Sequence, residues 1–163
     1  MNRKAFTVEE ANALVPALNE VFREIRAHRH TIRDAAQKIE VLELLWGNAV
    51  RDASNPDYAE FVRLHQDVDR AMRGVQRVVE EGVVARGLRF PAGGVENGLV
   101  DFPTTYFGRW VYLCWHVGER EVRYWHELDT GFQGRQEITP ADRKEMGTGD
   151  ASQIDDSGLD FPE

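Results

Sequence analysis

The strongest constraint on the fold is a stripe of apolar residues that repeats every three or four positions for about five heptads. Such a stripe runs along one side of an α-helix, so it predicts a long helix that packs against a partner. Charged residues flank the stripe, and His28 is its one polar member. Its members are Leu14, Leu18, Val21, Ile25, His28, Ile32, Ala35, Ile39, Leu42, Trp46 and Ala49.

Local signals predict where this helix begins and where the next one starts. Thr7 and Glu10 have the spacing of a capping box, which favours a helix start. Gly47 and the polar stretch after it interrupt the apolar pattern. Asn55 followed by Pro56 favours a new helix, because proline suits the first helical position.

A second stripe with the same spacing runs from Tyr58 to Gly82. Because the connection is short, we expect an antiparallel two-helix, coiled-coil-like hairpin over about residues 7–86. A turn centred near residues 53–54 places His28 opposite Val79. One hairpin buries only one seam, so we expect a homodimer that forms a four-helix arrangement.

From Gly98 onward the apolar pattern changes to period two, which is typical of β strands. We expect a small antiparallel sheet, a meander over about residues 98–138. Val117 and Gly118 form a two-residue turn in this prediction, which places Arg109 across from His126. The predicted strands are Leu99–Phe102, closed by Pro103, then Arg109–Trp115, Glu119–Leu128 and a short one near Gln136–Ile138.

Both faces of the predicted sheet are rich in aromatic side chains, although a small sheet usually has one polar face. One face should therefore pack on the helices, and the other should meet a partner, a ligand or a second subunit. The first face holds Val111, Leu113, Trp115, Val122, Tyr124 and His126, and the second holds Trp110, Tyr112, Cys114, Arg123, Trp125 and Glu127.

Residues 140–163 carry seven acidic and two basic side chains, so they hold −5 of the net charge of −8. Their Asp, Gly and Ser content predicts a disordered acidic tail, with Phe161-Pro162 as a short candidate recognition element. The fold class is therefore α+β. We expect a single domain over residues 1–139, made of the helical hairpin and the sheet, followed by the tail.

Composition argues against several classes of protein. A net charge of −8 argues against nucleic-acid binding, although the basic stretch Arg23–Arg33 leaves that alternative open. No apolar run reaches the roughly 18 residues of a membrane span, and the N-terminus lacks the apolar region of a signal peptide. The single cysteine fits a reducing cytoplasm and excludes a zinc site built from several thiolates.

Several motifs resemble one bacterial family. Phe6–Pro16 matches the family's opening, Phe-Thr-x-Glu-Glu-Ala-Asn-x-Leu-x-Pro. The chain is similar over roughly residues 5–138 to the uncharacterised "domain of unknown function" family 2203, and this resemblance implies a small cytosolic protein with no assigned activity. His116 departs from the pattern, since the family is more often basic there. The other matching motifs are Gly98–Pro103, Gly108-Arg109, Leu113–Trp115, Gly118-Glu119, Trp125-His126 and Gly131–Arg135.

The polar residues of these motifs are the candidate ligand-binding site, namely Asp101, Arg109, Glu119, His126 and Arg135. In the structural interpretation, Asp101 forms an ion pair with Arg109 or Arg135. In the functional one, the two arginines hold an anion and His126 carries a proton. We expect no metal site, because no HExxH or similar spacing is present. The cofactor is unknown, and Cys114 is expected to be an inert buried thiol.

Two hypotheses for the function follow. The first is a cytoplasmic interaction or assembly protein that self-associates through its helices and presents an aromatic sheet face to a protein partner. The alternative is an enzyme or ligand-binding protein, dependent on a small molecule or a metal, with its site around Arg109, His126 and Arg135.

Overall fold

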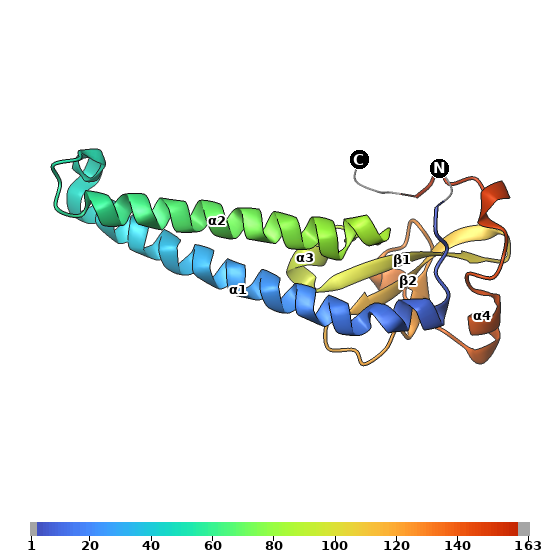
Figure 1. The fold of residues 1–163 in the computed structure, drawn as a ribbon. Helices are drawn as coiled ribbons and strands as arrows, with labels where there is room; N and C mark the ends of the chain where they lie inside the picture. Colours follow the sequence, from blue (N-terminus) through green and yellow to red (C-terminus); the bar gives the residue numbers. More distant parts are fainter. Residues whose placement is uncertain (1–2, 160–163) are drawn as a thin grey trace. The chain divides into compact units, whose positions relative to one another are not determined.

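The computed structural model describes residues 3–159, and the chain divides into two compact units. The helical unit comprises residues 21–80, and the sheet unit comprises residues 1–20 and 81–163. Two long helices and a four-stranded antiparallel sheet confirm the α+β class (Figure 1). Within residues 3–159, no helix has the length and apolar character needed to cross a membrane.

The first long helix, α1, spans Val8–Trp46 and begins at the predicted capping box. The Glu10 amide donates to Thr7 Oγ1 at 3.1 Å, and the Thr7 amide donates to Glu10 Oε2 at 3.0 Å. The helix ends where Gly47 adopts a left-handed φ of +55°, which favours glycine. The second long helix, α2, spans Tyr58–Gly82, and the 3₁₀ helix η1, Gly47–Arg51, follows α1.

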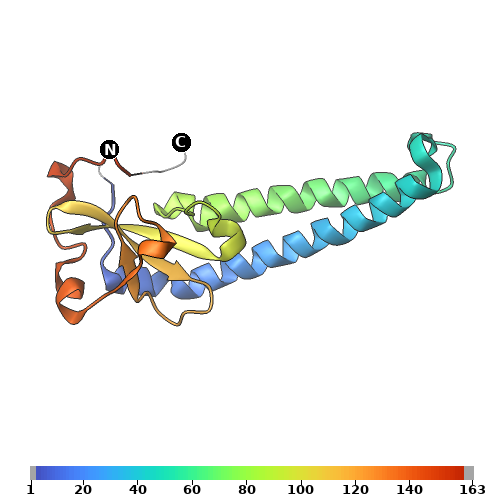
Figure 2. The same ribbon diagram turned by 180° about the vertical axis from the view of Figure 1, so that it is seen from behind.

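Within the helical unit, α1 and α2 lie side by side in both views (Figures 1 and 2). Their register differs from the prediction, because His28 lies against Gly74 rather than Val79. A Cβ atom on Gly74 would be 2.4 Å from the His28 ring. The predicted turn was centred too far along the chain. Trp46 Nε1 bonds Asp57 Oδ2 at 2.7 Å, which centres the connection near residues 51–52. The buried seam contains Ala35, Leu42, Val50, Phe61 and Leu64.

The sheet has the order β1-β2-β3-β4, which confirms the predicted meander. Phe107 and Gly108 join the first two strands, and both have a positive φ, as in a type I′ turn. The strands are β1 Leu99–Tyr106, β2 Arg109–His116, β3 Tyr124–His126 and β4 Gln136–Glu137.

The prediction that Pro103 closes the first strand is wrong, because β1 continues through it to Tyr106. The Pro103 carbonyl accepts from the Phe6 amide at 2.8 Å on the outer edge of β1. The nitrogen and carbonyl of a strand residue point to the same side, so the missing N–H faces away from β2. Arg89 and Gly147 also bond this edge, at Asp101 and Thr105, so the edge is covered.

The register between β2 and β3 also differs from the prediction. His126 lies opposite Tyr112, not Arg109, because residues 117–123 form a longer loop than the expected two-residue turn. This three-residue shift is odd, so it turns every β3 side chain to the other face. His126 therefore shares a face with Tyr112 and Cys114, and not with Leu113.

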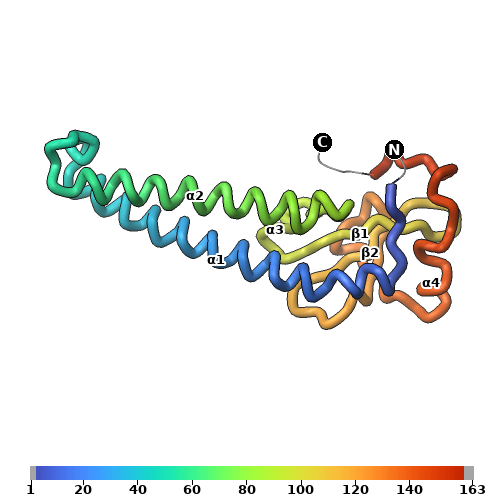
Figure 3. The backbone as a smooth tube through the Cα atoms, in the orientation of Figure 1, coloured from blue at the N-terminus to red at the C-terminus, as the bar shows by residue number. Residues whose placement is uncertain are grey.

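Residues 140–159 are not the disordered tail that their composition predicted (Figure 3). The helix α4, Pro140–Glu145, starts at a capping box formed by Thr139 and Asp142. Apolar side chains hold this acidic segment against the sheet unit. Met146 is buried, and Leu159 packs against Trp110 and Tyr112. The sheet face that holds Trp110 and Tyr112 is therefore covered there by the chain itself. Phe161-Pro162 lies outside the described residues.

Candidate functional site

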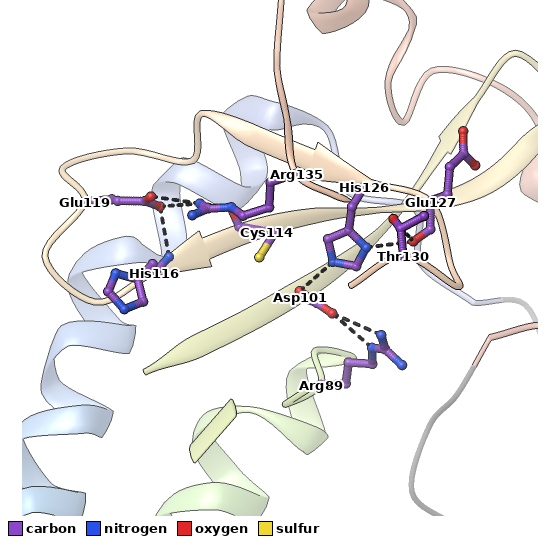
Figure 4. Close-up of polar contacts among 9 residues, drawn as sticks. All are labelled: Arg89, Asp101, Cys114, His116, Glu119, His126, Glu127, Thr130 and Arg135. Carbon is purple, nitrogen blue, oxygen red and sulfur yellow. Dashed lines mark hydrogen bonds and ion pairs between the residues drawn. The ribbon is translucent and has the colours of Figure 1, made fainter. Parts of the chain in front are cut away.

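Three side chains that can bind a metal lie together on one face of the sheet (Figure 4). Asp101, Cys114 and His126 come from β1, β2 and β3, and each is at most 1% exposed. Their ligand atoms all lie within 4.8 Å of one another, and no second such group occurs in residues 3–159. Asp101 and Cys114 are opposite each other in the β1–β2 ladder, so backbone pairing fixes their proximity.

Arg89 completes this cluster from outside the sheet. Its Nε and Nη2 atoms donate to Asp101 Oδ2 at 3.2 and 3.1 Å. Its guanidinium also lies 3.9 Å from the centre of the Tyr112 ring. A backbone bridge between Arg89 and Asp101 places the side chain. The predicted ion pair of Asp101 is therefore present, but its partner is Arg89 rather than Arg109 or Arg135.

His126 is held by hydrogen bonds at both ring nitrogens. Nδ1 lies 2.7 Å from the Glu127 carbonyl oxygen, and Nε2 lies 3.3 Å from Asp101 Oδ1. Burial lowers the pKa of His126. The hydrogen bond and negative charge of Asp101, with the Glu127 carbonyl, outweigh burial, so the net pKa is raised.

The thiol of Cys114 has the opposite character to a reactive cysteine. Burial raises its pKa strongly, and the negative charge of Asp101 raises it further. Both effects favour the neutral thiol, which is a poor nucleophile.

Glu119 and Arg135 form a second pair on the adjoining loops (Figure 4). Arg135 Nη2 donates to both Glu119 carboxylate oxygens at 2.8 Å and to the Cys114 carbonyl at 3.2 Å. Glu119 Oε2 also accepts from the His116 amide at 2.9 Å. This pair connects the loop after β2 to the segment before β4.

Arg109 is separate from both groups. It pairs with Glu127, with 2.6 Å between Nη2 and Oε1, and its side chain is 46% exposed. The structure therefore brings Asp101 together with His126, and Glu119 together with Arg135. The candidate anion site would need Arg109, His126 and Arg135 to converge, and each of them has a different acidic partner.

Sequence reasoning missed Arg89 as a member of the site. It lies in the glycine-rich joint between the helices and the sheet, where no periodic pattern marks a buried position. The one available signal was chemical, because a buried aspartate in a strand requires a cationic or hydrogen-bonding partner.

Comparison with known proteins gives a family but no activity. No curated protein and no solved structure matches the chain. A family model described as an uncharacterised conserved protein (DUF2203) matches residues 4–138, which cover both long helices and the whole sheet. The chain therefore belongs to the DUF2203 family.

Proposed function

We propose that the protein is an assembly protein whose helical unit binds the helical unit of a second copy. The observation that carries the proposal is a set of exposed apolar side chains on α1. Val41, Leu44 and Leu45 are 54%, 80% and 68% exposed. Their i, i+3, i+4 spacing puts them on one face of the helix, and apolar patches of this kind mark protein interfaces.

These side chains lie outside the seam between α1 and α2. Ala35 and Leu42 of the predicted stripe are already buried against Phe61 and Leu64 within one chain. A groove of about 460 Å³ lies beside Val41 on the helical unit. Its lining residues are Asp34, Gln37, Lys38, Val41, Leu42 and Glu60. A partner helix that fills this groove would cover the apolar face.

The charge distribution favours a second copy as this partner. His28 lies against Gly74, so residues 34 and 68 stand at about the same level of the helical unit. Residues 21–33 and 68–80 contain seven bases and three acids, whereas residues 34–67 contain three bases and seven acids. Two copies in antiparallel orientation place each basic half against an acidic half, which gives a symmetric interface. Met72, 57% exposed, is the apolar contact of the basic half.

The alternative, an enzyme or ligand-binding protein with a site around Arg109, His126 and Arg135, has less support. Two of these side chains are engaged with Glu127 and Glu119, and the third with Asp101. Nucleic-acid binding by the basic half is a further alternative, which the same experiments test.

Sedimentation velocity over a range of protein concentrations tests the proposal. We expect a dimer that dissociates as salt rises, because screening weakens contacts between exposed charges. Leu44→Glu should raise the dimer dissociation constant at least about tenfold, since burial of one leucine contributes about 1.5–3 kcal/mol. Gln66→Glu adds an exposed charge to the same half and is the control. A monomer at every concentration and salt would overturn the proposal.

A charge exchange tests the orientation of the two copies. The pair Glu40→Lys and Glu43→Lys should weaken self-association, and so should the pair Arg73→Glu and Arg77→Glu. Mixing the two variants should restore a dimer, because each acidic half again meets a basic one. If added RNA or DNA restores self-association and the complementary variant does not, the nucleic-acid alternative is favoured.

A further inference from the structure

We propose that Asp101, Cys114 and His126 form a binding site for one divalent d-block cation, with Zn²⁺ as the best match. This inference is independent of the self-association proposed above. It concerns residues of the sheet unit alone.

The first step of the argument concerns the protons of His126. The Glu127 carbonyl is only an acceptor, and it also receives hydrogen bonds from the Thr130 amide and Oγ1 at 3.4 and 3.3 Å. The short contact of 2.7 Å to Nδ1 therefore requires a proton on Nδ1. Metal-binding histidines commonly donate their second N–H to a backbone carbonyl in this way.

The second step concerns the gap between His126 and Asp101. With Nδ1 protonated, neutral His126 directs the lone pair of Nε2 at Asp101 Oδ1, 3.3 Å away. Arg89 donates to the other carboxylate oxygen of Asp101, at 3.1 Å from Nη2. The Nε2 lone pair and Asp101 Oδ1 would repel each other at this distance unless a cation lies between them. That cation is either a second proton on His126 or a metal ion. Two ligands of one tetrahedral zinc stand about 3.3 Å apart when both bonds are about 2.0 Å long.

The third step concerns the ligand set and its charge. Thiolate, imidazole and carboxylate are the ligands that Zn²⁺ takes, and three protein ligands leave one position for water. A divalent ion would displace the proton on His126 Nε2 and the proton on Cys114 Sγ. Bonds to nitrogen, sulfur and Asp101 Oδ1 form as two protons leave for solvent. The +2 of the ion replaces the +1 of each proton, so the charge of this buried cluster stays the same.

Cobalt substitution is the most direct test, because Cys114 is the only cysteine of the chain. The site is buried, so the full chain is unfolded with a chelator and refolded with Co²⁺ in slight excess. We expect one Co²⁺ per chain, visible d–d bands of a tetrahedral site and a near-ultraviolet sulfur-to-cobalt charge-transfer band. Zn²⁺ should displace the cobalt and remove both signals.

Variants identify the ligands. Cys114→Ala should abolish the charge-transfer band, and His126→Gln should weaken binding by more than about 100-fold, since even outer partners of a metal contribute about 10–100-fold. His30→Gln changes an exposed histidine of α1 and should bind as the wild type does. Folded protein that binds no Co²⁺, or binding that survives both ligand substitutions, would overturn the proposal and leave an imidazolium–carboxylate pair.

Discussion

The helical unit and the sheet unit place their charged side chains in different environments. In the helical unit, ion pairs such as Arg63–Glu60 and Arg70–Asp67 lie at the surface, and each arginine side chain is at least 66% exposed. In the sheet unit, the Arg89 and Asp101 side chains are 9% and 0% exposed. An arginine–carboxylate pair therefore affects the free energy of unfolding differently in the two units. Water screens the surface pairs of the helical unit, whereas it is excluded from the buried Arg89–Asp101 pair.

This difference separates two uses of charge. An exposed charge contributes little to folding, so α1 and α2 can vary their charges to select a partner. A buried charge must be matched by a fixed partner, so Asp101 depends on Arg89 and His126 for its position. Substitutions of the same type in both units measure how much more a buried charge contributes to stability than an exposed one.

The largest effect is expected for Asp101→Asn compared with Asp67→Asn. The first leaves Arg89 and His126 without their anion in a dry site, which should lower the free energy of unfolding by about 3–5 kcal/mol. The second removes an exposed pair and should cost about 0–1 kcal/mol. Urea denaturation of both variants with a chelator present measures the two values. Similar values for both would contradict the comparison.

A smaller effect is expected for glycine to alanine changes, again one in each unit. Gly147 has φ +73°, and an added Cβ would lie 2.5 Å from the backbone oxygen of Phe6, so Gly147→Ala should cost about 1–3 kcal/mol. Gly74→Ala meets only the His28 ring, a side chain that can rotate away. It also gains up to about 1 kcal/mol of helix propensity. Thermal unfolding should show a marked loss of stability for Gly147→Ala alone.

The sequence predicted the elements of the fold better than their pairing. Thr7, Glu10 and Gly47 mark the ends of α1 through local hydrogen bonds and backbone preference, which act over a few residues. The register of β2 and β3 depends on the length of the loop after His116, and the chain offered Val117-Gly118 as a plausible shorter turn. A turn dipeptide is therefore a weaker guide to register than a heptad stripe is to a helix.

The sequence identified two members of the site, Asp101 and His126, but it missed Arg89 and assigned Cys114 no role there. Asp101 and His126 were candidates because they are polar residues of the motifs that resemble the family. The odd shift in register moved His126 to the face of Cys114, which brought the three ligand atoms together. No metal motif was visible because the ligands come from three strands, and their separations of 12 and 13 residues match no local spacing. Disorder was predicted for residues 140–159 from their Asp, Gly and Ser content. That average gives no weight to single apolar side chains such as Met146 and Leu159, which are buried.

The pH dependence of stability should report the buried histidine in metal-free protein. The net pKa of His126 is raised, so its stabilising contribution is full below the unfolded value of about 6.5 and is lost as pH rises through the folded value. Asp101, Arg89 and Cys114 face the ring, and the unfolded thiol ionises only above about 8.5. Urea denaturation between about pH 6 and 8 should therefore show a decline that His126→Gln lacks. A flat profile for the wild type would mean that His126 is neutral.

The smallest effect is expected for Arg109→Ala. This variant tests whether the cost of losing an ion pair depends on burial of the pair or on its position in the sheet unit. Arg109 belongs to the sheet unit, yet its pair with Glu127 is exposed, with side chains 46% and 35% accessible. If burial is the cause, urea denaturation should show a cost of about 0–1 kcal/mol, as for Asp67→Asn. A cost near that of Asp101→Asn would instead assign the difference to the strands themselves, because Arg109 and Glu127 connect β2 to the end of β3 across the sheet. Arg135→Ala, which removes the partner of the less exposed Glu119, should fall between these two values.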